Sequence, residues 1–283
     1  MKKSVSAFIA LILTALCLCS CDITDLAQGN LRIKYKIDGD SAIVTDIPDN
    51  LTLPEIVIPD EYDGKRVTAI ADFAAVNLEN VTKITIGKNV SEIGLWAMEN
   101  NKRLTAIEVD EDNEYFCDVD GVLFSKDMKT LIFYPMARDV KELQLSDGAT
   151  VQGIEYCIPE GVEVIRTKAF YKCSDLRKLT LPSTLEAIEE KAFFRCSFSE
   201  ITLPDTLTFI GKDAFSYCGE LTELTIPSEI TEIDEYAFYN CVKLLDITVE
   251  ADEAEITLGK KWYPTNNGLE INGLSVKWGK DSD

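Results

Sequence analysis

A pattern of apolar and polar positions recurs along this chain with a period of 22 or 23 residues. The copy at residues 224–244 reads LTIPSEITEIDEYAFYNCVKL, and two earlier copies begin at Ile201 and Leu179. Each copy keeps one proline in the same place, namely Pro182, Pro204 and Pro227. A fixed period of this size indicates a solenoid, in which each repeat buries its apolar face against the next one.

Within one copy, the alternation of apolar and polar residues predicts a short strand. Leu244, Ile247 and Val249 should point inward, while Asp246 and Thr248 should point outward. The proline then ends the strand, because it has no N–H group for the ladder. We therefore expect an α/β repeat with short strands and one helical turn per coil.

The later part of each copy completes the expected coil. Ile230 and Ile233 predict a second short extended segment, and Ala237 followed by Phe238 predicts the helical turn. Adjacent strands stack about 4.8 Å apart, so equivalent residues should form ladders. One such inward ladder contains Phe170, Phe193, Phe215 and Phe238.

The ends of the chain depart from the repeat. Alternating residues around Asp38-Gly39-Asp40 predict a hairpin, which we interpret as an N-terminal cap over residues 31–55. Residues 251–283 contain Trp262, Tyr263 and Trp278 and are interpreted as a C-terminal cap. The predicted solenoid occupies residues 56–250.

An insertion at residues 110–153 interrupts the solenoid. Val122–Phe124 and Leu131–Tyr134 flank a turn, which predicts a hairpin in place of the helical turn, and Leu143–Leu145 predicts another short strand. The rest of the insertion is expected to be irregular. Its acidic run, Asp110–Glu114, superficially suggests a calcium loop, but it lacks the glycine and the final glutamate that an EF-hand requires. We interpret the run as a solvated turn.

The first 21 residues have the features of an export signal. Lys2 and Lys3 precede an apolar stretch from Val5 to Leu18, which is short for a membrane span. The following Leu-Cys-Ser-Cys resembles a bacterial lipobox and predicts lipidation of Cys21, with residues 22–30 as a tether. A plain secretory signal and an uncleaved anchor are the alternatives. Cys17 is a poorer lipidation site because Leu16 precedes it.

The composition of the chain excludes several classes of function. The 283 residues carry a formal charge of −21, and 46% of them are apolar, so the chain can fold but has no basic footprint for nucleic acid. The absence of histidine removes His-based triads and His–metal ligation. With no CxxC pair either, we expect no cofactor, no metal and no catalytic residues.

Four of the nine cysteines recur with the repeat, namely Cys173, Cys196, Cys218 and Cys241. Stacked one coil apart, their Cα atoms would lie within disulfide range. Parallel side chains and the apolar surroundings instead favour buried free thiols. Metal binding is disfavoured, because four ligands in a line cannot form a tetrahedron.

The repeated pattern IxIPxxVxxIxxxAFxxCxxL resembles the BspA-like leucine-rich repeats of bacterial surface proteins, over about residues 32–250. The interrupting segment NEYFCDVDGVLFSKDMKTLIFYP is similar to one found in that family. The chain departs from the pattern at Ala75 and Met98, which replace Phe, and at Leu78 and Asn101, which replace Cys. The resemblance implies a curved right-handed solenoid, exposure at the bacterial cell envelope and a role in adhesion or protein interaction. The family offers no catalytic residues to carry over.

The outward positions of the strands are the candidate binding residues. One ladder is charged and its neighbour is made of threonine, and together they contain Lys178, Glu200, Glu223, Asp246, Thr180, Thr202, Thr225 and Thr248. Such a face serves solubility equally well. A second candidate is an aromatic stripe of Tyr171, Phe194 and Tyr239, although packing between coils also explains it.

We therefore expect a non-enzymatic, lipid-anchored cell-surface protein that binds a protein or glycan partner. A structural scaffold of the envelope is the alternative, and a hydrolase is a weaker third hypothesis, because carboxylate pairs arise by chance among 49 acidic residues. The expected protein is a monomer that contacts the membrane only through its N-terminal lipid and binds no nucleic acid.

Overall fold

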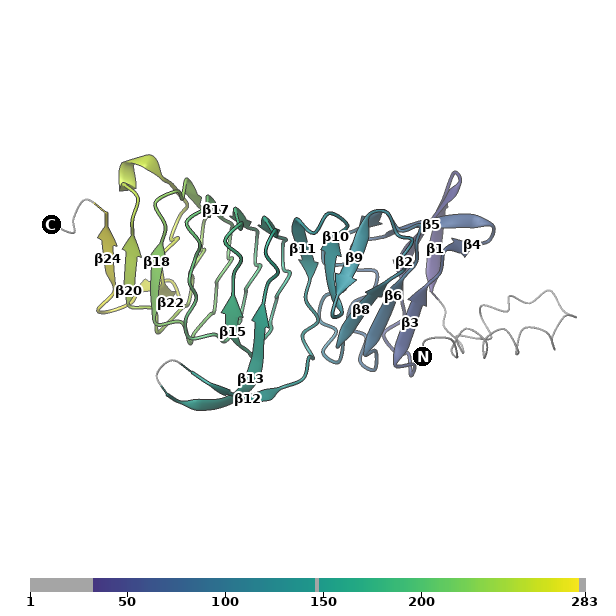
Figure 1. Ribbon diagram of the computed structural model, residues 1–283, viewed down its shortest axis with the longest axis horizontal. Helices are drawn as coiled ribbons and strands as arrows, with labels where there is room; N and C mark the ends of the chain where they lie inside the picture. The colour runs from purple at the N-terminus through teal and green to yellow at the C-terminus, as the bar shows by residue number, and fades with distance from the viewer. Residues whose placement is uncertain (1–32, 146–147, 280–283) are drawn as a thin grey trace, which may run out of the picture. The chain divides into compact units, whose positions relative to one another are not determined.

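The computed structural model describes residues 33–145 and 148–279, and the chain from Ile33 onward forms one compact unit. The unit is a β-solenoid of the leucine-rich-repeat type, as predicted, with two series of parallel strands along the stacked coils (Figure 1). The predicted signal at residues 1–21, the lipidation at Cys21 and the tether at residues 22–30 lie outside the described residues.

The first series of strands comes from the segment that precedes each proline. Before the insertion it consists of β3 (Glu55–Ile58), β6 (Lys83–Ile86) and β8 (Ala106–Val109). After the insertion it consists of β13 (Thr150–Cys157), β15 (Leu176–Thr180), β18 (Glu223–Ile226), β20 (Asp246–Val249) and β24 (Ser275–Trp278). The predicted alternation is confirmed in β18, where Leu224 and Ile226 are buried and Glu223 and Thr225 are exposed.

The second series consists mainly of two-residue strands and confirms the second extended segment. It runs through β14 (Val164–Ile165), β16 (Ala187–Ile188), β17 (Phe209–Ile210), β19 (Glu232–Ile233) and β21 (Thr257–Leu258). The parallel register places Ile165, Ile188, Ile210 and Ile233 in one buried ladder. In the first coils the same part of the fold is built by β5 (Lys65–Ile70) and β7 (Glu92–Ile93).

The predicted helical turn is wrong. The only helix among the described residues is a short 3-10 segment, η1 (Glu253–Glu255). In the turn segment around Phe193, the N–H groups of alternate residues donate to the next coil, as from Phe193 to the Ala214 carbonyl at 2.8 Å. The N–H groups between them donate three residues back, as from Phe194 to the Lys191 carbonyl. An α-helix needs donation four residues back throughout, so this pattern excludes it.

Left-handed residues cause that pattern. Lys191 and Arg195 have φ of 56° and 61°, and every regular coil repeats two such residues at the same places. We call residues 94–101, 166–173 and their equivalents the turn segments. A left-handed residue before the conserved alanine and another before the cysteine position cannot lie within a right-handed helix.

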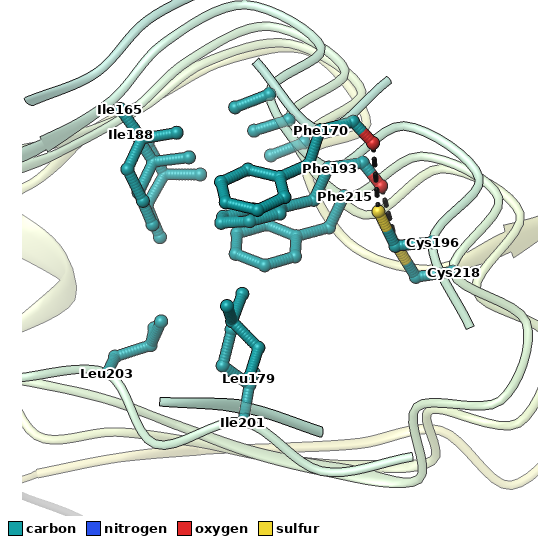
Figure 2. Packing of buried hydrophobic residues seen from close by; sticks show 14 of the residues in the cluster. Ile165, Phe170, Leu179, Ile188, Phe193, Cys196, Ile201, Leu203, Phe215 and Cys218 are labelled. Atoms are coloured by element: carbon teal, nitrogen blue, oxygen red, sulfur yellow. Dashed lines mark hydrogen bonds between the residues drawn. The ribbon is translucent and has the colours of Figure 1, made fainter. Parts of the chain in front are cut away.

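The core is a stack of aromatic rings, as predicted. Phe170, Phe193, Phe215 and Phe238 follow one another with centroid separations of 5.2, 5.2 and 5.3 Å, and all four are fully buried. Figure 2 shows three of these rings beside the isoleucines of the second series. The stack extends beyond the repeat, because Tyr134 stacks on Phe170 at 4.7 Å and Trp262 packs edge-on against Phe238.

The insertion is more regular than expected. It forms β9 (Phe116–Val119), the predicted hairpin of β10 (Val122–Ser125) and β11 (Thr130–Phe133), and β12 (Lys141–Gln144). Because β11 pairs with β14, the second series of the C-terminal coils extends into the insertion and ends at β9, in a sheet separate from that of β5 and β7. The first series instead restarts at β13, which pairs with β12 through residues 150–153 and with β15 through residues 154–157.

Smaller elements lie at the two ends. The hairpin expected around Gly39 is formed by β1 (Lys34–Asp38) and β2 (Ser41–Asp46), and β2 pairs with β5, so the hairpin covers an edge of the second series. The loop between the first coil's strands holds β4 (Glu61–Tyr62). Near the C-terminus, β22 (Thr265–Asn266) pairs with β23 (Leu269–Glu270), and Trp262 contacts Tyr263 and Trp278. In the described part of the chain, no helix is long and apolar enough to cross a membrane.

Candidate binding surface

The eight predicted partner-binding residues line one groove on the strand face of the C-terminal coils. The groove has a volume of about 830 Å³ and extends from Glu155 to Lys277. All eight of the predicted residues border it, namely Lys178, Thr180, Glu200, Thr202, Glu223, Thr225, Asp246 and Thr248. We call this feature the strand groove.

Strand register puts six of these side chains in two columns, while Glu200 and Thr202 lie in the intervening coil, which forms no strand at this place. Glu223 lies opposite Asp246 and Thr225 lies opposite Thr248, because β18 and β20 pair in parallel without a shift. In the same way Glu155 lies opposite Lys178. The charged column precedes each buried leucine or isoleucine, and the threonine column follows it, so the alternation of the strand sends both columns outward.

Sequence reasoning missed several residues of the strand groove. Glu155 precedes Pro159 by four residues, just as Lys178 precedes Pro182, so this spacing was a usable signal. Lys277 carries no such signal, because the tail has lost the repeat, and only the pairing of β24 with β20 places it beside Thr248. Asp205 and Glu250 also border the groove.

The charge of the strand groove is unbalanced. Six carboxylates and two ammonium groups line it, which gives a formal charge of −4. No ion pair among the described residues involves Glu223 or Asp246. Since like charges directly opposite each other destabilise a sheet, the placement of Glu223 opposite Asp246 costs stability.

The N-terminal strands show carboxylates that are balanced by a lysine. On β6, Lys83 lies between two carboxylates, with its Nζ 3.2 Å from Glu55 and 3.4 Å from Glu108. Partial burial acts to lower the pKa of Lys83, but the two carboxylates outweigh it and the pKa is raised. In the C-terminal sheet Glu223 lies directly opposite Asp246, which lies opposite Ser275, so no lysine lies directly opposite either carboxylate among these three strands.

The periodic cysteines lie away from the strand groove and in the core. Cys173, Cys196, Cys218 and Cys241 are buried free thiols, as predicted. The Cys196 thiol donates to the Phe170 carbonyl at 3.2 Å and the Cys218 thiol donates to the Phe193 carbonyl at 3.1 Å (Figure 2).

Burial raises the pKa of all four thiols, that of Cys218 to about 12, so they stay protonated at neutral pH. A protonated thiol is neither a nucleophile nor a metal ligand. The ladder is therefore structural.

Asn101 shows what the cysteine position does. It replaces cysteine in its coil, is buried, and donates from Nδ2 to the Ala75 carbonyl at 2.7 Å and to the Met98 carbonyl at 2.9 Å. Ala75 is one coil earlier and occupies the phenylalanine position, so the bond reproduces the one that Cys196 makes to Phe170. In these coils the side chain at this position donates a hydrogen bond to the preceding coil. Leu78 has no such donor, but its own N–H donates to Asn101 Oδ1.

The predicted aromatic stripe lies on the turn segments. Tyr171 stacks on Phe194 at 5.1 Å, and Tyr217, which sequence reasoning missed, links Phe194 to Tyr239. Tyr217 was missed because it follows Ser216 rather than the core Phe215 directly. Among the described residues, no group of three or more Cys, Asp or Glu side chains is arranged to hold a metal ion.

Comparison with known proteins identifies the family. The model of the BspA type leucine rich repeat region matches residues 49–131 and 151–261, in six copies. The chain therefore belongs to the BspA-type leucine-rich-repeat family. No curated protein matches it.

Solved structures of bacterial repeat proteins are similar to the chain. The pneumococcal vaccine antigen PcpA is 26% identical with a TM-score of 0.61, and the match covers 82% of this chain and 60% of that one. A leucine-rich repeat protein from Eubacterium ventriosum is 23% identical with a TM-score of 0.49, covering 65% and 59%. A leucine rich cell surface protein from Faecalibacterium prausnitzii is 18% identical with a TM-score of 0.44, covering 88% and 75%. The chain thus spans about three fifths of the first two proteins.

Proposed function

We propose that this chain is a non-enzymatic binding protein of the bacterial cell surface that engages a protein partner through the strand groove. One observation carries the proposal: the outward residues of successive coils meet in one groove whose charge is left unbalanced. Family membership and the likeness to a pneumococcal vaccine antigen support a surface role. Lipidation of Cys21 would attach the chain to the envelope.

The chemistry of the strand groove favours a cationic protein segment over a glycan. No aromatic side chain lines the groove, so it offers no ring against which a sugar could pack. Carboxylates in register along successive coils offer repeated acceptors for lysine and arginine side chains. The threonine hydroxyls beside them both donate and accept hydrogen bonds, so they suit the polar backbone of an extended segment.

The scaffold and hydrolase hypotheses have less support. A passive spacer gains nothing from a groove in which carboxylates outnumber lysines, whereas a surface that binds a cationic segment does. Within the described residues, the strand groove brings together carboxylates, threonines and two lysines without a nucleophile held against a base, so no observation favours hydrolysis.

The test compares two double variants of the full chain. Glu223→Gln/Asp246→Asn removes two charges from the strand groove, and Glu55→Gln/Glu108→Gln removes two from the N-terminal strands. The probe is an immobilised lysine-rich peptide, with a glutamine-for-lysine peptide of the same length as the reference. We expect the first variant to weaken binding roughly tenfold or more and the second to leave it within about twofold. Equal binding by all forms of the chain would refute the proposal.

A further inference from the structure

The left-handed positions of the turn segments carry side chains that this backbone conformation does not favour. A non-glycine residue with positive φ is best accommodated as Asn or Asp, and a bulky residue there is unfavourable. Among the twelve such positions in the six regular coils, four are Asn or Asp, four are aromatic and four are cationic. The last eight are Phe73, Trp96, Tyr217, Tyr236, Lys168, Lys172, Lys191 and Arg195. The sequence therefore places aromatic and cationic side chains at positions whose backbone conformation disfavours them.

These side chains combine with the aromatic stripe into one surface. Tyr171, Phe194, Tyr217 and Tyr239 follow one another at centroid separations of 5.1, 5.3 and 5.7 Å, one ring per coil. Arg195 lies over the rings of Phe194 and Tyr217, at 5.5 and 5.0 Å from their centroids. We call these residues, with Lys172, the aromatic edge.

Two cations of the aromatic edge have no carboxylate partner. Lys168 pairs with Glu99 at 2.8 Å, and Lys191 pairs with Glu190 and Asp213. Lys172 and Arg195 form no ion pair among the described residues, and each lies over a ring, with Lys172 4.8 Å from the centroid of Tyr171. In a chain with 49 acidic residues, two adjacent coils thus leave their positive charges uncompensated at the surface.

The aromatic rings, like the two uncompensated cations, favour an anionic ligand. Tyr171 and Phe194 stack face to face, whereas Tyr217 is tilted against Phe194 and edge-on to Tyr239, so the ring edges and tyrosine hydroxyls that these contacts do not use are available to a ligand. Ring edges carry partial positive charge and phenol hydroxyls donate hydrogen bonds. Tyr217 is 36% exposed and accessible for such contacts.

We propose that the aromatic edge binds an anionic polysaccharide, meaning a polymer of carboxylated or sulfated sugars. The rings recur at 5.1 to 5.7 Å, which does not match the rise of about 3.2–3.4 Å per residue in an extended acidic protein segment and suits a ligand with a longer repeat, such as a chain of sugar rings. The net negative charge of the chain opposes any polyanion, but screening confines that repulsion to about 10 Å at 0.1 M salt. Local contacts with Lys172 and Arg195 therefore decide the binding.

The test uses the full chain and three immobilised polymers, namely heparin, polygalacturonate and uncharged dextran. We expect binding to at least one of the two anionic polysaccharides and none to dextran, with the affinity falling as salt rises. Lys172→Gln/Arg195→Gln should weaken the binding roughly tenfold or more. The matched control, Lys178→Gln/Lys277→Gln, removes two cations from the strand groove instead and should have little effect.

Three results would overturn the proposal. Equal weakening by both double variants would show a general charge effect. Equal or tighter binding of polyglutamate, lost in the same variant, would assign the edge to an acidic protein. If the folded chain, checked by its thermal unfolding, binds neither anionic polysaccharide, the aromatic edge does not have this function. Lys172 and Arg195 lie outside the strand groove. Failure of the strand groove to bind the basic peptide would therefore leave the result of the polysaccharide test unchanged.

Discussion

Substitution of Glu223 by lysine should stabilise the protein while abolishing binding of the basic peptide. Glu223 lies directly opposite Asp246 in the parallel register, and Glu200 occupies the same place one coil earlier. Lysine at this position would lie directly opposite Asp246, as Lys83 lies directly opposite Glu55 and pairs with it at 3.2 Å; Lys83 also reaches Glu108 diagonally at 3.4 Å.

The expected gain follows from cross-strand pairs. Each opposite-charge pair on a sheet contributes about 0.2–1 kcal/mol, and each like-charge pair costs a similar amount. The substitution removes repulsion and adds two attractive contacts, but all three side chains are exposed and screened by solvent. We therefore expect a gain of about 1 kcal/mol, which corresponds to a Tm increase of about 2–4 °C for a chain of this size.

Thermal unfolding followed by circular dichroism at low salt and at about 1 M salt would measure this gain, because the Debye length falls to about 3 Å at the higher concentration. Glu223→Gln should give a smaller increase, and Lys83→Glu should lower the Tm. A Glu223→Lys variant that melts at or below the wild-type temperature in low salt would refute the reasoning. So would a gain that persists unchanged at high salt.

Three further predictions concern the core. Phe215→Ala should cost about 3–5 kcal/mol, since it removes a fully buried ring from the middle of the stack. Asn101→Leu should cost about 3 kcal/mol by leaving buried backbone groups unpaired, whereas Asn101→Cys keeps the donor and should cost less. Denaturant unfolding measures the free energy of unfolding of the Phe215 and Asn101 variants. Stability should also fall as pH rises above about 9, because unfolding exposes thiols that ionise there while folded Cys196 and Cys218 stay protonated. Replacing both with alanine should reduce that slope by up to about 1.4 kcal/mol per pH unit for each thiol.

Controls separate these effects from general damage. Tyr217→Ala changes a partly exposed ring next to the stack and should cost clearly less than Phe215→Ala. If the two variants lose the same free energy of unfolding, the phenylalanine ladder does not stabilise the protein as predicted. An Asn101→Leu variant as stable as Asn101→Cys would argue against the donor role of that position. A pH slope that is the same with and without the two thiols would contradict the linkage.

The repeat could be predicted because every coil imposes the same environment on the same position. Burial of Phe215 or Ile233 depends only on the neighbouring coils, and those are copies of itself. The turn segment was misjudged for the opposite reason. Ala-Phe is compatible with a helix, and the left-handed residues before the alanine and the cysteine position, such as Lys191 and Arg195, give no sequence signal because they are neither Gly nor Asn.

The interruption could be predicted only in part. The apolar composition of Val122–Phe124 predicts its strand. Nothing in the sequence indicates that Tyr134 takes the phenylalanine position of the repeat, because the period is lost there. The outward residues of the strand groove were predictable wherever a proline fixes the phase. Lys277 was not, because its place depends on the pairing of β24 with β20.

The parallel stacking of coils has a consequence for how such a surface can evolve. Each coil from Pro182 to Pro227 contributes one charged residue and one threonine to the strand groove while closing its hydrogen bonds with its neighbours. Duplication of a single coil would lengthen the groove by one position of each kind without disturbing the ladders on either side. The length of the strand groove is thus set by the number of coils, whereas its chemistry is set by two codons in each of them.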